Sequence, residues 1–185
     1  MSTNLMPYYY VNTLTGTKSA KLIEDPGEYA HYIKMANRPL LVIGARVLTM
    51  KLGSKLVIEF AIEISKTLNI PICATAHTAK KLLELGVTPA SRLDTVEILN
   101  FLKNPAWEGV KGEGNHDLVL FLGIRADLAE QGLSTLKHFA PHVKTMTLCK
   151  YYYPNASYSL TNYRKDDNWK NFLDSLVVEL GRKGE

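Results

Sequence analysis

The stretch Leu118-Val119-Leu120-Phe121-Leu122-Gly123 is apolar at every position before its glycine. An apolar run without alternation is typical of a strand that is covered on both faces, as in a parallel sheet. A second run of this kind, Leu40-Leu41-Val42-Ile43-Gly44, stands nearer the start of the chain. Further strands are predicted over 71–75 and 143–148. The sequence therefore predicts a sheet whose strands are buried on both sides.

Segments with helical spacing separate these predicted strands. In the longest of them, Leu52, Leu56, Phe60, Ile64 and Leu68 recur every four residues, which predicts one deeply packed helix. The other predicted helices span 25–37, 78–85, 94–103, 125–138 and 168–180. Phe139, at the end of the fourth of these, is predicted to face inward, and Asp166 and Asp167 are predicted to precede the last. Strands that alternate with helices imply a parallel sheet with right-handed crossovers. The predicted fold class is α/β, a three-layer Rossmann-like parallel sheet with helices on both faces.

The chain has 185 residues, which is the size of one domain of roughly 150 residues with a tail. Residues 1–24 show no periodicity and are predicted to be an N-terminal arm, and residues 25–185 a single α/β domain. The start of the chain has neither the basic nor the apolar region of a secretory signal, so we expect a cytoplasmic protein. No apolar run approaches the ~18 residues of a membrane span, so we expect no membrane contact.

The charge is mildly basic, with 22 Lys and Arg residues against 18 Asp and Glu residues. The cations are scattered as pairs with acidic residues between them, so no basic stripe follows a phosphate backbone and nucleic acid is not an expected partner. This balance suits an acidic protein partner or an anionic cofactor equally well.

Two cysteines, Cys73 and Cys149, are the only thiols of the chain. An iron–sulfur cluster normally takes four cysteine ligands, and a structural zinc site takes four Cys or His side chains at close spacing. We therefore expect no metal site in this chain. Both cysteines fall in or beside predicted central strands, where a thiol is usually an inert hydrophobic group. The sequence also contains no catalytic motif of the G-x-S-x-G, H-E-x-x-H or P-loop type.

Polar and glycine residues directly follow several predicted strands. Ligands of open α/β sheets bind at the carboxyl ends of the strands, where the strand order reverses. The alternative is that the glycines only permit tight turns between strand and helix, and that His77 has a turn-capping or surface role. The candidate cofactor-binding residues, for FAD or another dinucleotide, are Gly44, Ala45, Arg46, Thr75, His77, Gly123 and Arg125.

Two tyrosine triplets stand out in a chain with ten tyrosines and five phenylalanines. Exposed tyrosine is favoured at protein interfaces because it offers a large contact area with a polar tip. Ordinary packing at the edge of the core is the alternative. The candidate partner-interface residues are Tyr8, Tyr9, Tyr10, Tyr151, Tyr152 and Tyr153.

Several segments carry a resemblance to known families. The segments 38–45, 69–75 and 116–123 resemble the central domain of thiamine-diphosphate enzymes, an NAD- or FAD-binding-like α/β domain. From residue 36 onward the chain more specifically resembles the epsilon subunit of the archaeal acetyl-CoA decarbonylase/synthase complex, also called the carbon monoxide dehydrogenase epsilon subunit. The marks are Arg38-Pro39, Asn104-Pro105-Ala106-Trp107-Glu108-Gly109, the segment 112–117, and Tyr152-Tyr153-Pro154-Asn155-Ala156-Ser157.

The second resemblance implies a non-catalytic accessory subunit of a complex that cleaves acetyl-CoA reversibly and interconverts CO and CO2. Its implied partner is the alpha subunit of carbon monoxide dehydrogenase, which holds nickel and iron–sulfur clusters, in an assembly of two alpha and two epsilon subunits. The implied roles are stabilising the alpha subunit and aiding electron transfer to FAD. The family's histidine-rich stretch before Pro-Asn-Ala is here Tyr151-Tyr152-Tyr153. A homodimer, and a stand-alone FAD- or dinucleotide-binding protein related to the thiamine-diphosphate enzyme domain, are the open alternatives.

Overall fold

Six strands pair in parallel to form one sheet in the order β1-β8-β7-β6-β2-β5. The computed structural model describes residues 19–182. Both long apolar runs lie side by side at the centre, as β2 (Pro39–Ile43) and β6 (Leu118–Leu122). The other strands are β1 (Lys21–Leu22), β5 (Ile72–Ala74), β7 (Lys144–Thr147) and β8 (Tyr158–Ser159).

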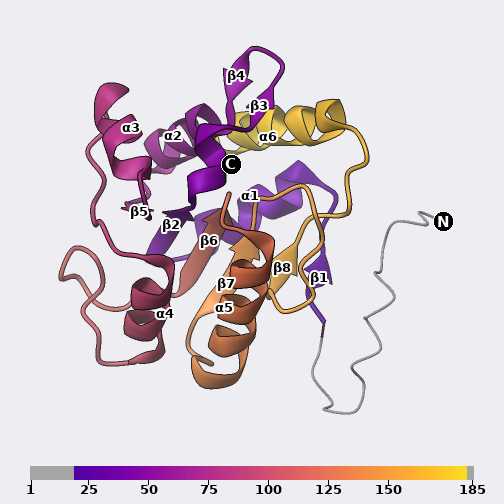
Figure 1. The fold of residues 1–185 in the computed structure, drawn as a ribbon. Helices are drawn as coiled ribbons and strands as arrows, with labels where there is room; N and C mark the ends of the chain where they lie inside the picture. Colours follow the sequence, from indigo (N-terminus) through magenta and orange to yellow (C-terminus); the bar gives the residue numbers. More distant parts are fainter. Residues whose placement is uncertain (1–18, 183–185) are drawn as a thin grey trace.

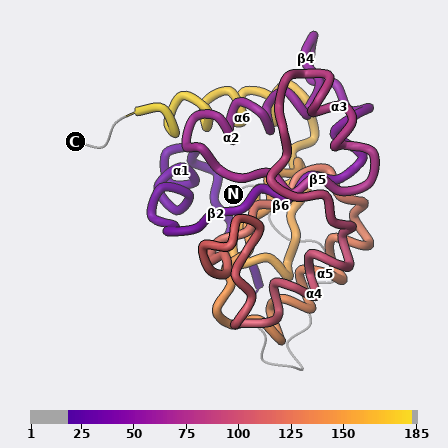
Figure 2. Tube along the Cα trace, turned by 90° about the vertical axis from the view of Figure 1, so that its left-hand side faces the viewer, coloured from indigo at the N-terminus to yellow at the C-terminus, as the bar shows by residue number. Residues whose placement is uncertain are grey.

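Helices cover both faces of the sheet (Figure 1). On one face, α6 (Asp166–Gly181) packs against both α1 (Pro26–Met35) and α2 (Val57–Leu68). On the other face, α4 (Thr95–Lys103) packs against α5 (Ala126–Phe139), and Figure 2 shows this pair apart from the first group. The short helices η2 (Ala45–Leu48) and α3 (Thr78–Glu84) contact each other. The α/β fold class and the parallel sheet with helices on both faces are confirmed, and this arrangement is consistent with a Rossmann-like fold.

The central strands are apolar throughout, and each of their side chains after Pro39 enters one of two cores. Leu41 and Ile43 of β2 point into the core under α1, α2 and α6, while Leu40 and Val42 point into the core under α4 and α5. All four are fully buried. The fully buried central strands therefore explain why the sequence shows runs rather than alternation.

Two of the helices begin at a residue whose side chain caps the first turn. The Asp94 carboxylate accepts a hydrogen bond from the Glu97 N–H (2.8 Å), and the Glu97 side chain accepts one from the Asp94 N–H. Asp25 caps α1 in the same way, through the Glu28 N–H (2.9 Å). Such caps satisfy N–H groups that have no partner inside the helix.

The helical spacing predicts one helix over 52–69, and this prediction is wrong for its first residues. Residues 51–56 form a two-stranded hairpin, β3 (Lys51–Leu52) and β4 (Lys55–Leu56), and α2 begins only at Val57. Gly53 turns the chain between the two strands with φ +63, a backbone conformation that favours glycine and interrupts a helix. Leu52 is nevertheless buried, so its apolar spacing reports burial and not helical structure.

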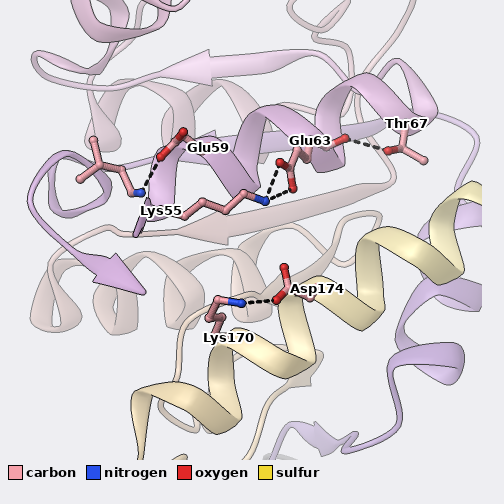
Figure 3. A network of polar contacts seen from close by, with 7 residues as sticks. Lys55, Glu59, Glu63, Thr67, Lys170 and Asp174 are labelled. Atoms are coloured by element: carbon pink, nitrogen blue, oxygen red, sulfur yellow. Dashed lines mark hydrogen bonds and ion pairs between the residues drawn. The ribbon is translucent and has the colours of Figure 1, made fainter. Parts of the chain in front are cut away.

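The hairpin is tied to α2 by two carboxylates of that helix. Figure 3 shows Lys55 reaching along α2 to Glu63, at 2.6 Å between Nζ and Oε1. The Glu59 carboxylate accepts a hydrogen bond from the Leu56 N–H (2.6 Å). These contacts fix the base of the hairpin against the helix that follows it.

Two short segments and one side chain add to this comparison. At the end of the predicted arm, Lys21–Leu22 pair with β8 and Ile23 is fully buried. Strand β8 was not predicted, because two residues carry too little pattern. Phe139, predicted to face inward, is 69% exposed at the end of α5. The rest of the predicted arm, residues 1–18, lies outside the described residues.

Candidate functional site

The strand order reverses between β2 and β6. From β2 the chain crosses to β5 at one edge, whereas from β6 it crosses to β7 and then β8 on the other side. Gly44 and Gly123 follow these two strands at their carboxyl ends. The structure therefore places both predicted glycines at the point where open α/β sheets bind ligands.

The two glycines allow the turns after β2 and β6 to pack against each other. The Gly44 N–H donates to the Leu122 carbonyl (2.8 Å), and the Arg46 N–H donates to the Gly123 carbonyl (3.0 Å). A Cβ atom at Gly44 would lie 2.4 Å from the Gly123 oxygen, and one at Gly123 would lie 2.3 Å from a Val47 methyl group. The chain itself occupies the space beside both glycines, so they leave no free cradle for a pyrophosphate. FAD binding across them stays a prediction.

The other predicted cofactor residues lie at the same edge but differ in what they offer. The Thr75 hydroxyl donates to the Ile43 carbonyl (2.9 Å) and is buried. Arg125 is paired with Asp127 (2.6 Å), and this hydrogen bond lowers the pKa of the Asp127 carboxyl. Ala45, Arg46 and His77 are exposed, and the His77 side chain makes no capping hydrogen bond to α3. Arg46 and His77 are therefore the polar side chains still accessible here.

A cleft of about 410 Å³ opens beside Arg46, on the side of β7. Lys150, which follows β7, is held there by Asp166 (2.7 Å), and this hydrogen bond raises the pKa of the Lys150 ammonium. The Lys150 Nζ also lies 5.3 Å from the centre of the Tyr151 ring. The lining residues are Arg46, Thr49, Met50, Lys51, Leu52, Lys150, Tyr151, Asp166 and Trp169.

Sequence reasoning missed Lys51, Asp166 and Trp169 as members of this cleft. The helical spacing that begins at Leu52 gives no reason to place Lys51 at a site, whereas the hairpin carries it to the carboxyl edge of the sheet. Asp166 and Trp169 were assigned only to the start and the buried face of the last helix. No local pattern in the sequence joins three segments so far apart in the chain.

Both cysteines are held in the thiol form by burial. Cys73 is fully buried in β5. The Cys149 sulfur accepts a hydrogen bond from the Gly123 N–H (3.4 Å). Burial raises the pKa of both thiols, which disfavours the reactive thiolate. These environments fit the inert role expected from the sequence.

The second tyrosine triplet divides into one exposed and two buried rings. Tyr151 is 51% exposed, whereas Tyr152 and Tyr153 are each 4% exposed. The Tyr152 hydroxyl donates to the Ala20 carbonyl (2.9 Å). For Tyr152 and Tyr153 the structure therefore favours packing, and of the three only Tyr151 offers a ring to a partner. Tyr8, Tyr9 and Tyr10 lie outside the described residues.

A second hollow, of about 260 Å³, lies at the opposite, amino end of β2 and β6. Its wall contains His116, which is buried between the turn before β2 and the loop that follows α4. The His116 Nε2 accepts a hydrogen bond from the Val110 N–H (3.2 Å), so the ring proton sits on Nδ1 and is donated to the Arg38 carbonyl (3.0 Å). The adjacent Asp117 accepts from the Asn37 and Arg38 N–H groups. These contacts hold the segment before β6 against the turn before β2.

Protonation of His116 should destabilise the fold. Burial lowers the pKa of His116, so the unfolded chain binds the proton more readily and stability falls as the pH drops below about 6.5, the pKa of an unperturbed histidine. Protonation would also place a hydrogen on Nε2 of His116, where it would face the Val110 N–H. We expect the free energy of unfolding, from denaturant titrations at pH 7.5 and 5.5, to fall more for the native chain than for His116→Gln. Equal losses of unfolding free energy in the two proteins would contradict this role. Burial raises the pKa of Glu130, so protonation of Glu130 stabilises the fold as the pH falls, but it does so equally in both proteins.

Within residues 19–182, no group of three or more His, Cys, Asp or Glu side chains is arranged to hold a metal ion. In the same part of the chain, none of the helices has the length and apolar character that a bilayer crossing needs.

Comparison with known proteins gives one consistent family. A model of the family described as "CO dehydrogenase beta subunit/acetyl-CoA synthase epsilon subunit" matches residues 2–177. The acetyl-CoA decarbonylase/synthase complex subunit epsilon of Methanothermobacter thermautotrophicus is 42% identical over 166 residues, which cover 90% of this chain and 91% of the relative. Subunit epsilon 1 of Archaeoglobus fulgidus is 41% identical over 76% of this chain and 74% of its own, and subunit epsilon of Methanothrix soehngenii is 36% identical over 80% and 78%.

Proposed function

The chain belongs to the family of CO dehydrogenase beta and acetyl-CoA synthase epsilon subunits, and from this premise we propose that it is the epsilon subunit of an acetyl-CoA decarbonylase/synthase complex. The observation that carries the proposal is the 42% identity to a relative of that name over 90% of the chain. The relatives are aligned along most of their own length as well. The likeness therefore covers the whole α/β sheet and is not confined to one motif.

The partner in this proposal is the alpha subunit of carbon monoxide dehydrogenase. The alpha subunit supplies the nickel and iron–sulfur centres, and the present chain stabilises it in an assembly of two alpha and two epsilon subunits. A chain with two cysteines has too few thiolates for a four-cysteine cluster of its own, which supports this division of roles. The exposed Tyr151 supports a protein contact near the turn after β7.

Co-expression tests this proposal. We expect the chain and the alpha subunit, mixed at micromolar concentration, to elute together from a sizing column and ahead of either protein alone. We also expect the alpha subunit to lose CO-oxidising activity more slowly on warming when the chain is present. Separate elution of the two proteins would contradict the proposal.

FAD binding is a second proposal, and one observation supports it: the strand order reverses between Gly44 and Gly123. Since the turns after β2 and β6 pack against each other, the residues present do not fit a dinucleotide between them, and a bound FAD must lie over Arg46, Thr75 and His77 instead. Titration of FAD into the chain and into its complex should then give saturable quenching of flavin fluorescence. The absence of saturation up to millimolar FAD in both samples would remove this proposal.

A further inference from the structure

The cleft beside Arg46 has fixed walls. Hairpin β3–β4, which carries Lys51, is attached to α2 through Lys55 and Glu63, as Figure 3 shows. The cleft is also lined by the Lys150–Tyr151 turn, which is attached to the start of α6 through Asp166. Since both walls are held by the chain's own contacts, the cleft needs no ligand to keep its form.

The charge of the cleft is unbalanced. Lys150 has Asp166 as its partner, but among the described residues no carboxylate lies within ion-pair distance of Arg46 or Lys51. Both of these cations are exposed. Three cations therefore face one carboxylate around a single opening, and the accessible charge is positive. A binding partner with carboxylates would be complementary to it.

The apolar part of the cleft indicates a peptide and not a small anion. Its floor is formed by Leu52 and Trp169, which are almost fully buried, and by the half-buried Met50. Tyr151 adds an exposed ring at the rim. Aromatic rings beside a fully buried floor are the usual anchors of protein interfaces.

The start of α6 argues against a phosphate group in the same place. A helix N-terminus attracts anions through its free N–H groups, but the first turn of α6 already carries Asp166 and Asp167. These two carboxylates interact with the helix dipole themselves and repel a doubly charged phosphate. Carboxylates spaced along a peptide can instead meet Arg46 and Lys51, the two lining cations that have no ion-pair partner among the described residues.

We propose that this cleft binds an acidic segment of the partner alpha subunit, with carboxylates at Arg46 and Lys51 and an apolar side chain over Leu52 and Trp169. The inference rests on the proposed function and names the docking surface for it. It uses the β7 side of the carboxyl edge, whereas the FAD proposal uses the β5 side and shares Arg46 with it.

Charge reversal tests the inference against a matched control. The double variant Arg46→Glu/Lys51→Glu changes the cleft, and Lys66→Glu/Lys80→Glu makes the same change in net charge on exposed positions of α2 and α3. With immobilised alpha subunit as the probe, we expect the cleft variant to weaken the dissociation constant by about 10–100-fold and the control by less than about threefold. We also expect a smaller dependence of affinity on salt for the cleft variant than for the native chain.

The outcomes distinguish a wrong docking surface from a wrong proposed function. If the native chain binds the alpha subunit and the cleft variant binds equally well, the docking surface is wrong and the proposed function stands. If the native chain itself does not bind, both proposals are wrong. Retained affinity for the alpha subunit together with lost affinity for FAD would overturn the inference and support the FAD proposal, which includes Arg46. Should the Glu variant unfold by circular dichroism, Arg46→Gln/Lys51→Gln serves in its place, with a weaker effect in the same direction.

Discussion

Replacing Gly123 by alanine is expected to destabilise the chain by at least ~3 kcal/mol, because it adds a backbone penalty to a steric clash. Gly123 has φ +70, and an added Cβ atom would lie 2.3 Å from a Val47 methyl group and 2.9 Å from the Val47 N atom. The methyl group can move by rotation of its side chain, but the backbone atom belongs to η2, which is hydrogen-bonded to the same turn. Relief of the clash therefore requires the turns after β2 and β6 to separate. Chemical denaturation at pH 7.5 measures the loss.

Gly112→Ala is the matched control. Gly112 has nearly the same backbone conformation, φ +73, with no atom within 4 Å of an added Cβ. It should cost only the backbone penalty, ~1–2 kcal/mol. The difference between the two variants then measures the contact between the turns. Equal losses would show that the turns are not packed as described. Gly44 and Gly123 would then be free to line a ligand site.

Replacing Trp169 by alanine should cost ~3–5 kcal/mol. Trp169 is 1% exposed and belongs to the core under α1, α2 and α6. Its indole N–H donates to the Leu148 carbonyl (2.9 Å), which joins α6 to the end of β7. The variant would leave a cavity and a buried carbonyl without its donor. The free energy of unfolding from denaturant titration measures the effect.

Two comparisons separate the contributions of Trp169. Trp169→Phe keeps most of the ring but loses the N–H, so it should be less damaging than the alanine variant. Trp107→Ala removes a half-buried indole that stacks on Phe101 at 5.4 Å between ring centres, and should cost less than Trp169→Ala. A loss below ~1 kcal/mol for Trp169→Ala would contradict the packing of α6 on the sheet.

The parts of the fold that the sequence predicts correctly are those with strong local physical signals. Strand β6 and all of β2 after Pro39 are buried, so these residues are apolar without exception. Asp94 and Glu97 cap α4 through contacts three residues apart. In both cases the interactions that form the element are visible in a short window of sequence.

The parts that differ depend on contacts between distant segments. Leu52 lies in helical register with α2 but is buried through the hairpin, whose turn at Gly53 outweighs the periodicity. Strand β8 consists of two residues and exists through its pairing with β1 and β7. Neither element has a local pattern strong enough to identify it.

The candidate site shows the same division. Gly44 and Gly123 were predicted at the carboxyl edge because glycine after a buried strand is a local signal. That they pack against each other depends on the pairing of β2 with β6. The cleft brings together Arg46, Lys51, Lys150 and Asp166, which are separated by as much as two thirds of the chain. Its positive charge becomes evident only when these segments are placed in space.

The central claim is that this chain is a subunit bound to the alpha subunit of carbon monoxide dehydrogenase. Native mass spectrometry of the co-expressed proteins tests it most directly, because it reports both partners and their ratio. The expected result is one dominant assembly whose mass equals two alpha subunits plus two copies of this 20.7 kDa chain. Detection of the alpha subunit and this chain only as separate species, under conditions that preserve other non-covalent complexes, would contradict the claim.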